Sequence, residues 1–529
     1  MKKPVIDRNR PLGLYLHIPF CKAKCAYCDF YSLPHSEEKM DAYAAALARH
    51  ITEVAPQMQN HRVDTVYFGG GTPSYLGHKR LIALLKTVKK QCRVWDRAEI
   101  TLEANPDSAG DWRTLRALRR AGFNRISLGV QSSDDEELRR LGRVHTWQQV
   151  KDAVAACRKA GLDNISLDLI YGLPDQTLEQ WENTLADALV LAPRHISCYG
   201  LKLEEGTPLY DRQESLNLPD GDLQADMYLY AVELLTQNGY QQYEISNFAQ
   251  PGYESRHNLK YWMLEEYAGF GPGAYSDFGG VRYGYTRDLD GYIAGRLDLA
   301  ESEHISPQER EMEYIMLRLR TARGIDIREF ENRFRQRFTP LAAILESCAA
   351  HGLARQTETG WCLTPRGFLV SNRIIGDLQE ELNRAEFRYV VPDFRLNKDF
   401  DRLSALPQWQ KDKVEFLCNE CCWFGCTQRK PCYEAVSRKA LGEDCEHICT
   451  APGGGEGYRF SKAMENPGFI SAADIQRIYA PMGFSHFKIE GRGLGSALLL
   501  EFLLHYMTKP EYRIHVREAV YLDSMLDLF

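Results

Sequence analysis

The sequence lacks any apolar run that approaches the roughly 18 uninterrupted residues of a membrane-spanning helix. Its first residues, 1–8, also lack the apolar core of a secretory signal peptide. An excess of positive charge is missing too, because the formal net charge is −7, so the overall balance does not favour nucleic acid or an anionic membrane as a partner. We therefore expect a cytoplasmic protein with no transmembrane segment and no nucleic-acid partner.

The 15 cysteines do not show the spread of a disulfide framework. Three of them lie within residues 21–28 and seven within residues 418–449, whereas the others stand singly among apolar neighbours, as Cys157 and Cys198 do. Clustered thiols in a reducing compartment are typical of metal ligands. We therefore interpret both groups as candidate metal sites.

The first group, Cys21, Cys25 and Cys28, has no fourth cysteine within the next sixty residues. A closed zinc site or an ordinary four-iron cube needs four ligands. Three thiolates on such a cube leave one iron open, as radical S-adenosylmethionine (SAM) chemistry requires: the cofactor chelates that iron, and one electron passed into its sulfonium releases a 5′-deoxyadenosyl radical. The alternatives, buried free thiols or an incomplete zinc knuckle, fit the downstream sequence less well.

Short β-rich runs alternate with longer segments of helical periodicity from residue 12 onward, which is typical of parallel β/α architecture. Strands are expected at residues 12–18, 65–69, 99–103, 125–129, 164–170 and 195–201. Helices are expected at residues 40–54, 80–91, 111–121, 147–160 and 178–191. Because polar residues recur at the carboxyl ends of these strands, we expect an open (β/α)6 barrel rather than a doubly wound sheet.

The polar strand ends suggest a cofactor pocket. Residues 69–73, GGGTP, follow the second strand, and the glycines suit a close backbone approach that offers N–H groups to the methionyl end of the cofactor; a simple tight turn is the alternative. Glu103 ends the third strand and could accept ribose hydroxyl protons. Gln131, Arg143 and Asp168 follow at or after later strand ends, although Arg143 could instead pair with a surface acid.

These motifs together resemble the HemN/HemW family over residues 11–382, and within that family the chain is closer to HemW. The resemblance rests on Tyr15-Leu16-His17-Ile18-Pro19-Phe20-Cys21, Phe68-Gly69-Gly70-Gly71-Thr72-Pro73, Gly129-Val130-Gln131-Ser132, Asp168-Leu169-Ile170-Tyr171-Gly172-Leu173-Pro174 and His257-Asn258-Leu259-Lys260-Tyr261-Trp262. Oxygen-independent coproporphyrinogen III oxidases continue the triad into a fourth cysteine, where this chain has Asp29, and carry a longer segment before the first strand. One departure is Ser133, where HemW-like chains usually have phenylalanine.

By motif position, the resemblance implies that the cysteine triad holds a [4Fe-4S] cluster. It also implies SAM contacts from Tyr15, Tyr27, Gly70, Gly71, Thr72, Glu103, Gln131, Arg143 and Asp168. The implied partners are haem or another porphyrin, a haemoprotein acceptor, and an electron donor such as flavodoxin or ferredoxin. His257, beside Tyr261 and Trp262, is a candidate axial haem ligand; a histidine that holds its loop by hydrogen bonds is an equal alternative.

We expect three domains: a radical SAM core at residues 1–290, a small winged-helix-like domain at 291–382, and a cysteine-rich partial β/α domain at 383–529. The third resembles the later part of the collagenase-like peptidase family, some of whose members hold a four-iron cluster with four cysteines. The resemblance lies in residues 414–417, in Cys445 and Cys449, and in residues 487–492. A second iron–sulfur cluster or zinc is expected on Cys422, Cys426, Cys445 and Cys449, with Cys418 and Cys421 as substitutes.

The resemblance to HemW and the second cysteine group leave two alternative functions. In the first, the protein is a haem chaperone that binds the cluster and SAM and passes haem to an acceptor. In the second, it is a radical enzyme, related to coproporphyrinogen oxidase or transferring a methyl or methylene group, that uses the C-terminal cysteines for an auxiliary cluster. The absent fourth cysteine favours the first, and the second cysteine group favours the second. SAM cleavage is expected in either case.

Overall fold

The computed structural model describes residues 10–386, 389–420, 422–426, 432, 460–489 and 496–517. The chain forms two compact units, Met1–Leu382 and Asn383–Phe529, and each is described by itself. Among the described residues, none of the helices combines the length and apolar character needed to cross a lipid bilayer.

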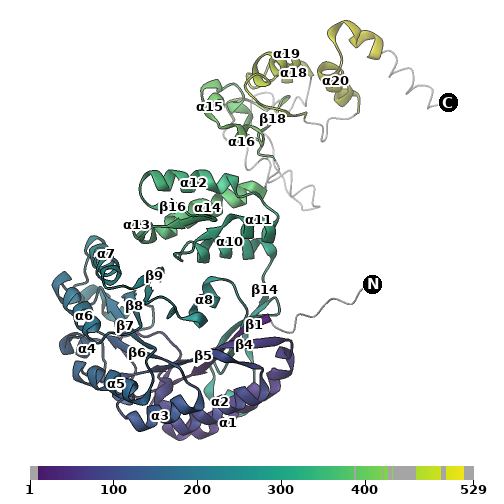
Figure 1. Ribbon diagram of the computed structural model, residues 1–529. Helices are drawn as coiled ribbons and strands as arrows, with labels where there is room; N and C mark the ends of the chain where they lie inside the picture. The colour runs from purple at the N-terminus through teal and green to yellow at the C-terminus, as the bar shows by residue number, and fades with distance from the viewer. Residues whose placement is uncertain are drawn as a thin grey trace. The chain divides into compact units, whose positions relative to one another are not determined.

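The first unit is built on a twelve-stranded sheet with helices along its outer side (Figure 1). Six neighbouring strands are parallel and follow chain order: β1 (Arg10–Ile18), β4 (His61–Gly70), β5 (Val94–Ala104), β6 (Arg125–Gln131), β7 (Ile165–Tyr171) and β8 (His195–Gly200). The main helices that follow these strands are α1 (Met40–Val54), α2 (His78–Gln91), α3 (Trp112–Ala121), α5 (Trp147–Ala160), α6 (Leu178–Val190) and α7 (Gly221–Gln237). The predicted α/β class is confirmed, and every predicted strand overlaps an observed one.

The sheet remains open because both ends of the parallel set pair with other strands. In the described part of the chain, β1 pairs with β4 and β11 rather than with β8, and β8 pairs with β7 and β10. The remaining strands are β9 (Gln241–Glu244), β10 (Asn247–Ala249), β11 (Tyr267–Phe270), β12 (Tyr275–Phe278), β13 (Val281–Tyr285) and β14 (Leu299–His304). The short helix α8 (Arg256–Trp262) lies between β10 and β11 in the chain.

Successive side chains of each parallel strand point to opposite faces of the sheet, and here one face is apolar and the other polar. On β6, Ile126, Leu128 and Val130 belong to the main hydrophobic core with the helices, whereas Arg125 and Ser127 lie on the opposite face and are also buried. The other central strands repeat this pattern, with buried polar residues at Thr65, Thr101, Ser166, His195 and Ser197. An inner face of this kind is available for binding chemistry rather than for core packing.

Residues 305–382 build a second hydrophobic cluster around Tyr314, Phe330 and Leu378. Its helices are α10 (Pro307–Arg318), α11 (Ile327–Phe334), α12 (Thr339–Ala350), α13 (Pro365–Leu369) and α14 (Ser371–Glu386), with a three-stranded sheet of β15 (Ile325–Asp326), β17 (Gly360–Leu363) and β16 (Ala354–Gln356). Tyr228 of α7 belongs to the same cluster. Apolar packing therefore joins this part to the barrel within one unit.

The second unit has a small aromatic core made of Phe416, Tyr479 and Phe484. Two short strands, β18 (Glu415–Leu417) and β19 (His486–Lys488), pair in parallel. The described helices around them are α15 (Phe400–Ala405), α16 (Gln408–Lys411), α18 (Phe460–Met464), α19 (Ala472–Asp474) and α20 (Ser496–Met507).

Candidate functional site

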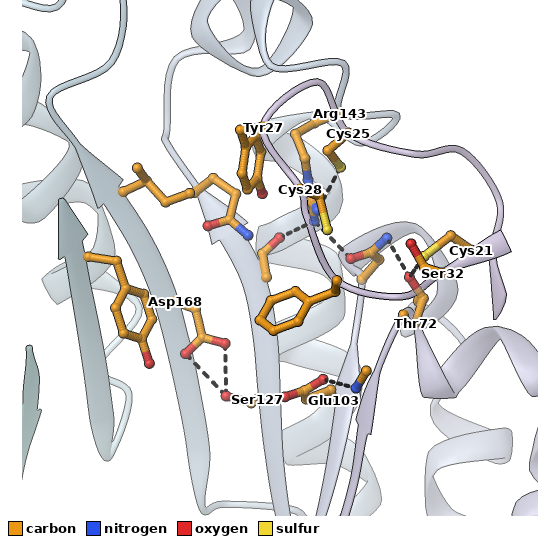
Figure 2. A pocket seen from close by; sticks show the side chains of 18 of the residues that line it. Cys21, Cys25, Tyr27, Cys28, Ser32, Thr72, Glu103, Ser127, Arg143 and Asp168 are labelled. Atoms are coloured by element: carbon orange, nitrogen blue, oxygen red, sulfur yellow. Dashed lines mark hydrogen bonds between the residues drawn. The ribbon is translucent and has the colours of Figure 1, made fainter. Parts of the chain in front are cut away.

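The inner face of the parallel strands lines a cavity of about 520 Å³ in the first unit. This volume is within the range of small-molecule and cofactor sites. Figure 2 shows the three cysteines on one loop, above Glu103, Ser127 and Asp168. The sequence-predicted residues that line the cavity are Cys21, Cys25, Tyr27, Cys28, Gly70, Gly71, Thr72, Glu103, Gln131, Arg143 and Asp168. Residues separated by almost 150 positions are therefore brought to one site.

Tyr15 is the exception among the predicted cofactor contacts. It lines a neighbouring cavity of about 320 Å³, and its hydroxyl lies 3.1 Å from Nδ1 of His17. The two cavities share Asp29 and Phe30, which directly follow Cys28. Tyr15 therefore lies beside the main cavity rather than in its lining, with its ring stacked against that of Tyr67 at 6.2 Å between centroids.

Backbone contacts hold the cysteine loop in place. Short strands β2 (Phe20–Cys21) and β3 (Leu33–Pro34) pair at its base. Between the cysteines, the Ala26 N–H donates to the Leu141 carbonyl at 3.0 Å, and the Ala26 carbonyl accepts from Leu209 at 2.8 Å. The loop is thus tied to the segments after β6 and β8 before any cofactor binds.

The three thiols are free, partly exposed, and surrounded by donors. Thr72 Oγ1 lies 3.5 Å from Cys21 Sγ, and Arg143 Nη1 lies 3.4 Å from Cys25 Sγ. Burial raises the pKa of Cys28 to about 11 and also raises the pKa of Cys21, so these two thiols need metal or nearby positive charge to ionise. In the described residues no group of three or more His, Cys, Asp or Glu side chains is placed to hold a single ion. The donor set fits a thiolate-bound cluster, which is larger than one ion.

Arg143 connects the thiols to the strand ends. Besides Cys25, its guanidinium donates to Asn105 Oδ1 at 2.8 Å and to the Gly129 carbonyl at 2.6 Å (Figure 2). The surface ion pair that was the alternative interpretation is therefore not what the structure shows. Arg143 is positioned to stabilise negative charge on the sulfur ligands.

The glycine-rich loop differs from the sequence expectation in one respect. Its N–H groups are already bonded within the protein: Gly70 donates to Glu103 Oε2 at 3.1 Å, and Gly71 and Thr72 donate to backbone carbonyls of Ile18 and Phe20 at 2.9 and 2.8 Å. A Cβ on Gly71 would lie 3.0 Å from Cys21 Sγ and 2.8 Å from the Phe20 carbonyl oxygen. The loop needs glycine to pack against the cysteine segment.

Glu103 is held by two donors, because Tyr67 donates its hydroxyl to Oε1 at 2.7 Å and Gly70 donates its N–H to Oε2 at 3.1 Å. Burial, with a smaller contribution from the nearby Asp168 charge, raises the pKa of Glu103 to about 7. The same cause raises the pKa of Glu244, on β9, to about 7. Both carboxyls thus titrate near neutral pH in the cluster-free protein.

We expect the cluster-free protein to lose stability as the pH rises from about 4.3 to about 7. The folded state keeps these two protons where the unfolded chain releases them, so each carboxyl lowers the free energy of unfolding by about 1.4 kcal/mol per pH unit, which is on the order of 3 kcal/mol for each carboxyl over this window. Urea unfolding of Glu103→Gln should show a shallower slope in this window, and Glu244→Gln should remove the other part. The exposed Glu53→Gln variant is the control, and an unchanged slope in Glu103→Gln would contradict the assignment.

Asp168 accepts hydrogen bonds from three serine hydroxyls on its own and the adjacent strands. Ser127 lies 2.9 Å from Oδ2, and Ser197 and Ser166 lie 2.7 and 3.1 Å from Oδ1. These bonds fix the carboxylate in one orientation at the centre of the inner face. The serines were not singled out from the sequence, although polar residues two positions apart along these strands were the available signal.

Gln131 ends β6 with φ of 70°, a left-handed conformation that is uncommon for a residue other than glycine. A register shift between Gly129 and Gln131 in the pairing with β7 accompanies it. This irregularity, a β-bulge, turns the Gln131 side chain toward the cavity that it lines.

His257 is positioned differently from a haem ligand. It is fully enclosed at the start of α8, with Nδ1 2.8 Å from Thr65 Oγ1 and Nε2 2.9 Å from the Tyr261 hydroxyl. Its backbone N–H donates to Glu99 Oε1 at 3.0 Å. Burial, followed by the Lys260 charge, lowers the pKa of His257 to about 3. With both ring nitrogens engaged, the geometry favours the alternative interpretation, a neutral histidine that holds its segment.

Replacing His257 with alanine is therefore expected to lower the free energy of unfolding by about 2–4 kcal/mol, because two buried hydroxyl partners lose their hydrogen bond. Any Soret maximum of added haem should keep its position. Chemical unfolding and haem titration provide the two readouts, with the exposed His351→Ala as a control. A lost or shifted Soret band at unchanged stability would restore His257 as the ligand.

In the second unit, Cys422 and Cys426 lie on one turn, where the Cys426 N–H donates to the Trp423 carbonyl at 3.0 Å. Asn466 Nδ2 donates to the Cys422 carbonyl at 2.9 Å. Cys418, a substitute ligand in the sequence interpretation, is instead packed in the aromatic core, and burial raises its pKa to about 12. Cys421, Cys445 and Cys449 lie outside the described residues.

Comparisons with known proteins indicate the family of this chain. Residues 15–188 match the family model of the Radical SAM superfamily, and residues 305–370 match that of the HemN C-terminal domain. The chain is also similar to a solved structure, coproporphyrinogen III oxidase (HemN) from Escherichia coli, with a TM-score of 0.62 and 25% identity over 71% of this chain and 91% of that chain.

Among curated relatives, the heme chaperone HemW of Lactococcus lactis is 39% identical over 337 residues, which are 63% of this chain and 88% of the relative. HemW of Bacillus subtilis is 35% identical over 70% of this chain and 99% of the relative. HemW of Escherichia coli is 36% identical over 69% of this chain and 97% of the relative. These relatives are thus matched over nearly their full length, whereas about 30% of this chain lies outside the matches.

Proposed function

Because this chain belongs to the HemW family of radical SAM proteins, we propose that it is a haem chaperone that holds a [4Fe-4S] cluster and SAM in the cavity of its first unit and delivers haem to acceptor proteins. The observation that carries the proposal is the cysteine triad in that cavity. Of the described residues that line the cavity, only Cys21, Cys25 and Cys28 are cysteines, which leaves one corner of a four-iron cube for SAM.

Different residues of the cavity would bind the cluster and SAM. The cysteine loop would bind the cluster, and when bound the cluster supplies the electron that cleaves the sulfonium of SAM. Arg143 donates to Cys25 Sγ and so places a positive charge beside the sulfur ligands. Glu103 and Asp168 present fixed carboxylates as acceptors for ligand hydroxyl or amino groups. Buried polar side chains of the parallel strands, such as Ser127 and Ser197, line the site beside them.

We extend the proposal to the partners that a haem chaperone needs: haem itself, a haemoprotein acceptor and a reductant such as flavodoxin or ferredoxin. A cytoplasmic location fits, because free thiols and an oxygen-sensitive cluster require a reducing compartment. The names of the curated relatives support haem as the cargo.

The proposed function is tested by measuring haem transfer under anaerobic conditions. The reconstituted full-length protein is loaded with haem and mixed with an apo-haemoprotein, and the acceptor's Soret band is followed with and without SAM and dithionite. Haem should move to the acceptor with its mass unchanged. Mass spectrometry of the tetrapyrrole decides the outcome, because a decarboxylated or methylated product would identify an enzyme instead of a chaperone.

A second candidate function has one observation in its favour. The matched HemW relatives cover at most about 70% of this chain, and the second unit carries Cys422 and Cys426 on one turn. A second metal site there, completed by Cys445 and Cys449, would suit an enzyme that uses an auxiliary cluster for substrate or electron transfer. Iron or zinc content of this unit separates the two functions, as the Discussion describes.

A further inference from the structure

Arg125 is a buried cation at the cavity of the first unit, and two of its nitrogens have no acceptor among the described residues. Its side chain is 1% exposed and lines the cavity, yet neither Nε nor Nη1 has a hydrogen-bond acceptor among the described residues. Leaving charged donors unpaired in a buried site is costly, so such groups in folded proteins bind an acceptor. The acceptor of Arg125 must therefore come from what the cavity contains.

The nearby carboxylates do not fill this role. Glu99 accepts from the backbone N–H groups of Arg256 and His257 with its two oxygens, each at 3.0 Å. Asp168 is bonded to three serines. Within the described part of the chain, no carboxylate lies within salt-bridge distance of the Arg125 guanidinium, although Glu99 and Asp168 are near enough to stabilise its charge. The Arg125 side chain thus presents two unpaired donor nitrogens at the cavity.

The carboxylate of SAM is an unsuitable partner because of its position. Arg125 is the first residue of β6 and Gln131 is the last, so six residues of strand, roughly 20 Å, separate their backbones. The cysteine loop and the glycine-rich loop lie at the carboxyl ends of the strands, where the SAM carboxylate would chelate the open iron. Arg125 lies at the opposite end, near enough to α8 for its charge to act on His257, and the next residue, Asn258, also lines the cavity.

We propose that Arg125 and Asn258 form a carboxylate subsite at the inner end of the cavity, which receives an acidic side chain of a second ligand held next to SAM. Under the proposed function, on which this inference rests, that ligand is haem and the acidic group is one of its propionates. A guanidinium paired with a carboxylate in a water-poor site forms strong, directional hydrogen bonds. The subsite would orient the macrocycle in the cavity, and it would favour tetrapyrroles with free acids.

The experiment compares haem with haem dimethyl ester, in which both propionates are blocked. The full-length, reconstituted protein is titrated with each, and the Soret change gives the two dissociation constants. The wild type should bind haem about tenfold or more tightly than the ester. In Arg125→Met this ratio should fall to near one, mainly through weaker haem binding, whereas Arg125→Lys should keep part of it.

Arg318→Met is the matched control. Arg318 is also a buried arginine of the first unit, but its Nε donates to the Gly324 carbonyl at 2.9 Å and its guanidinium pairs with Glu329, outside the cavity. Its loss should affect stability and leave the haem-to-ester ratio unchanged. Should Arg125→Met not fold, the wild-type ratio and Arg125→Lys still decide the question.

Equal binding of haem and its ester by the wild type would overturn the subsite and leave haem binding, and hence the proposed function, intact. An unchanged ratio in a folded Arg125→Met would also overturn it. Failure of both tetrapyrroles to bind the wild type would overturn the subsite and the proposed function together.

Discussion

Cys25→Ala is expected to lose the absorbance of the first iron–sulfur cluster and to reduce SAM cleavage to the background level. Two thiolates cannot hold a four-iron cube that still presents an open iron, and the variant also removes the sulfur that Arg143 contacts at 3.4 Å. The measurement is anaerobic reconstitution followed by the ultraviolet–visible spectrum and by quantification of 5′-deoxyadenosine after addition of SAM and dithionite. This is the largest effect that we predict for a single substitution.

Cys92→Ala is the matched control, because Cys92 is a partly exposed free thiol that does not line the cavity. It should reconstitute and cleave SAM like the wild type. Full SAM cleavage by a variant with alanine at residues 21, 25 and 28 would show that the triad is not the ligand set. Loss of cleavage in the Cys92 variant would point to a general requirement for thiols during reconstitution.

The second large effect concerns the C-terminal cysteines. If residues 422, 426, 445 and 449 hold another cubane, the reconstituted full-length protein should contain about eight irons, and Cys422→Ala combined with Cys426→Ala should reduce this to about four. Deletion of residues 383–529, which form a separate compact unit, should have the same effect. Zinc would instead give about one zinc beside four irons.

Elemental analysis with SAM-cleavage and haem assays separates the two functions. A chaperone that lacks residues 383–529 should still bind SAM and haem through the first unit, whereas an enzyme that needs the second site should keep uncoupled SAM cleavage and lose product. Cys348→Ala, a substitution of a free thiol in the first unit, should leave the metal content unchanged. A full-length protein with four irons and no zinc would show that these cysteines are not a metal site.

Much of the first unit could be predicted from the sequence because its signals are local. The predicted helix boundaries at residues 40–54 and 147–160 match α1 and α5. Thr146 caps α5 through a reciprocal bond with Gln149, and Gly161 ends it in the left-handed conformation. Strand β5 is longer than predicted because its first half, around Trp95, is exposed and lacks the apolar pattern.

The parallel β/α class, the cysteine triad and part of the cavity lining could be predicted from the sequence alone. These depend on spacing along the chain and on the rule that strands of this kind present their carboxyl ends at one edge. The positions of Gly70, Glu103, Gln131 and Asp168 followed from that rule, and all four line the observed cavity.

Only the tertiary structure decided how the remaining polar groups are satisfied. Thr65 and His257 are 192 residues apart, and their hydrogen bond, with that of Tyr261, engages both ring nitrogens of the histidine and favours a structural role over haem ligation. Ser127 and Ser197 reach Asp168 from the two adjacent strands. Arg125, by contrast, has no acceptor at Nε or Nη1 among the described residues. Such partners depend on which strands become neighbours, and local spacing does not encode this because hydrogen bonds form through space, independently of separation along the chain.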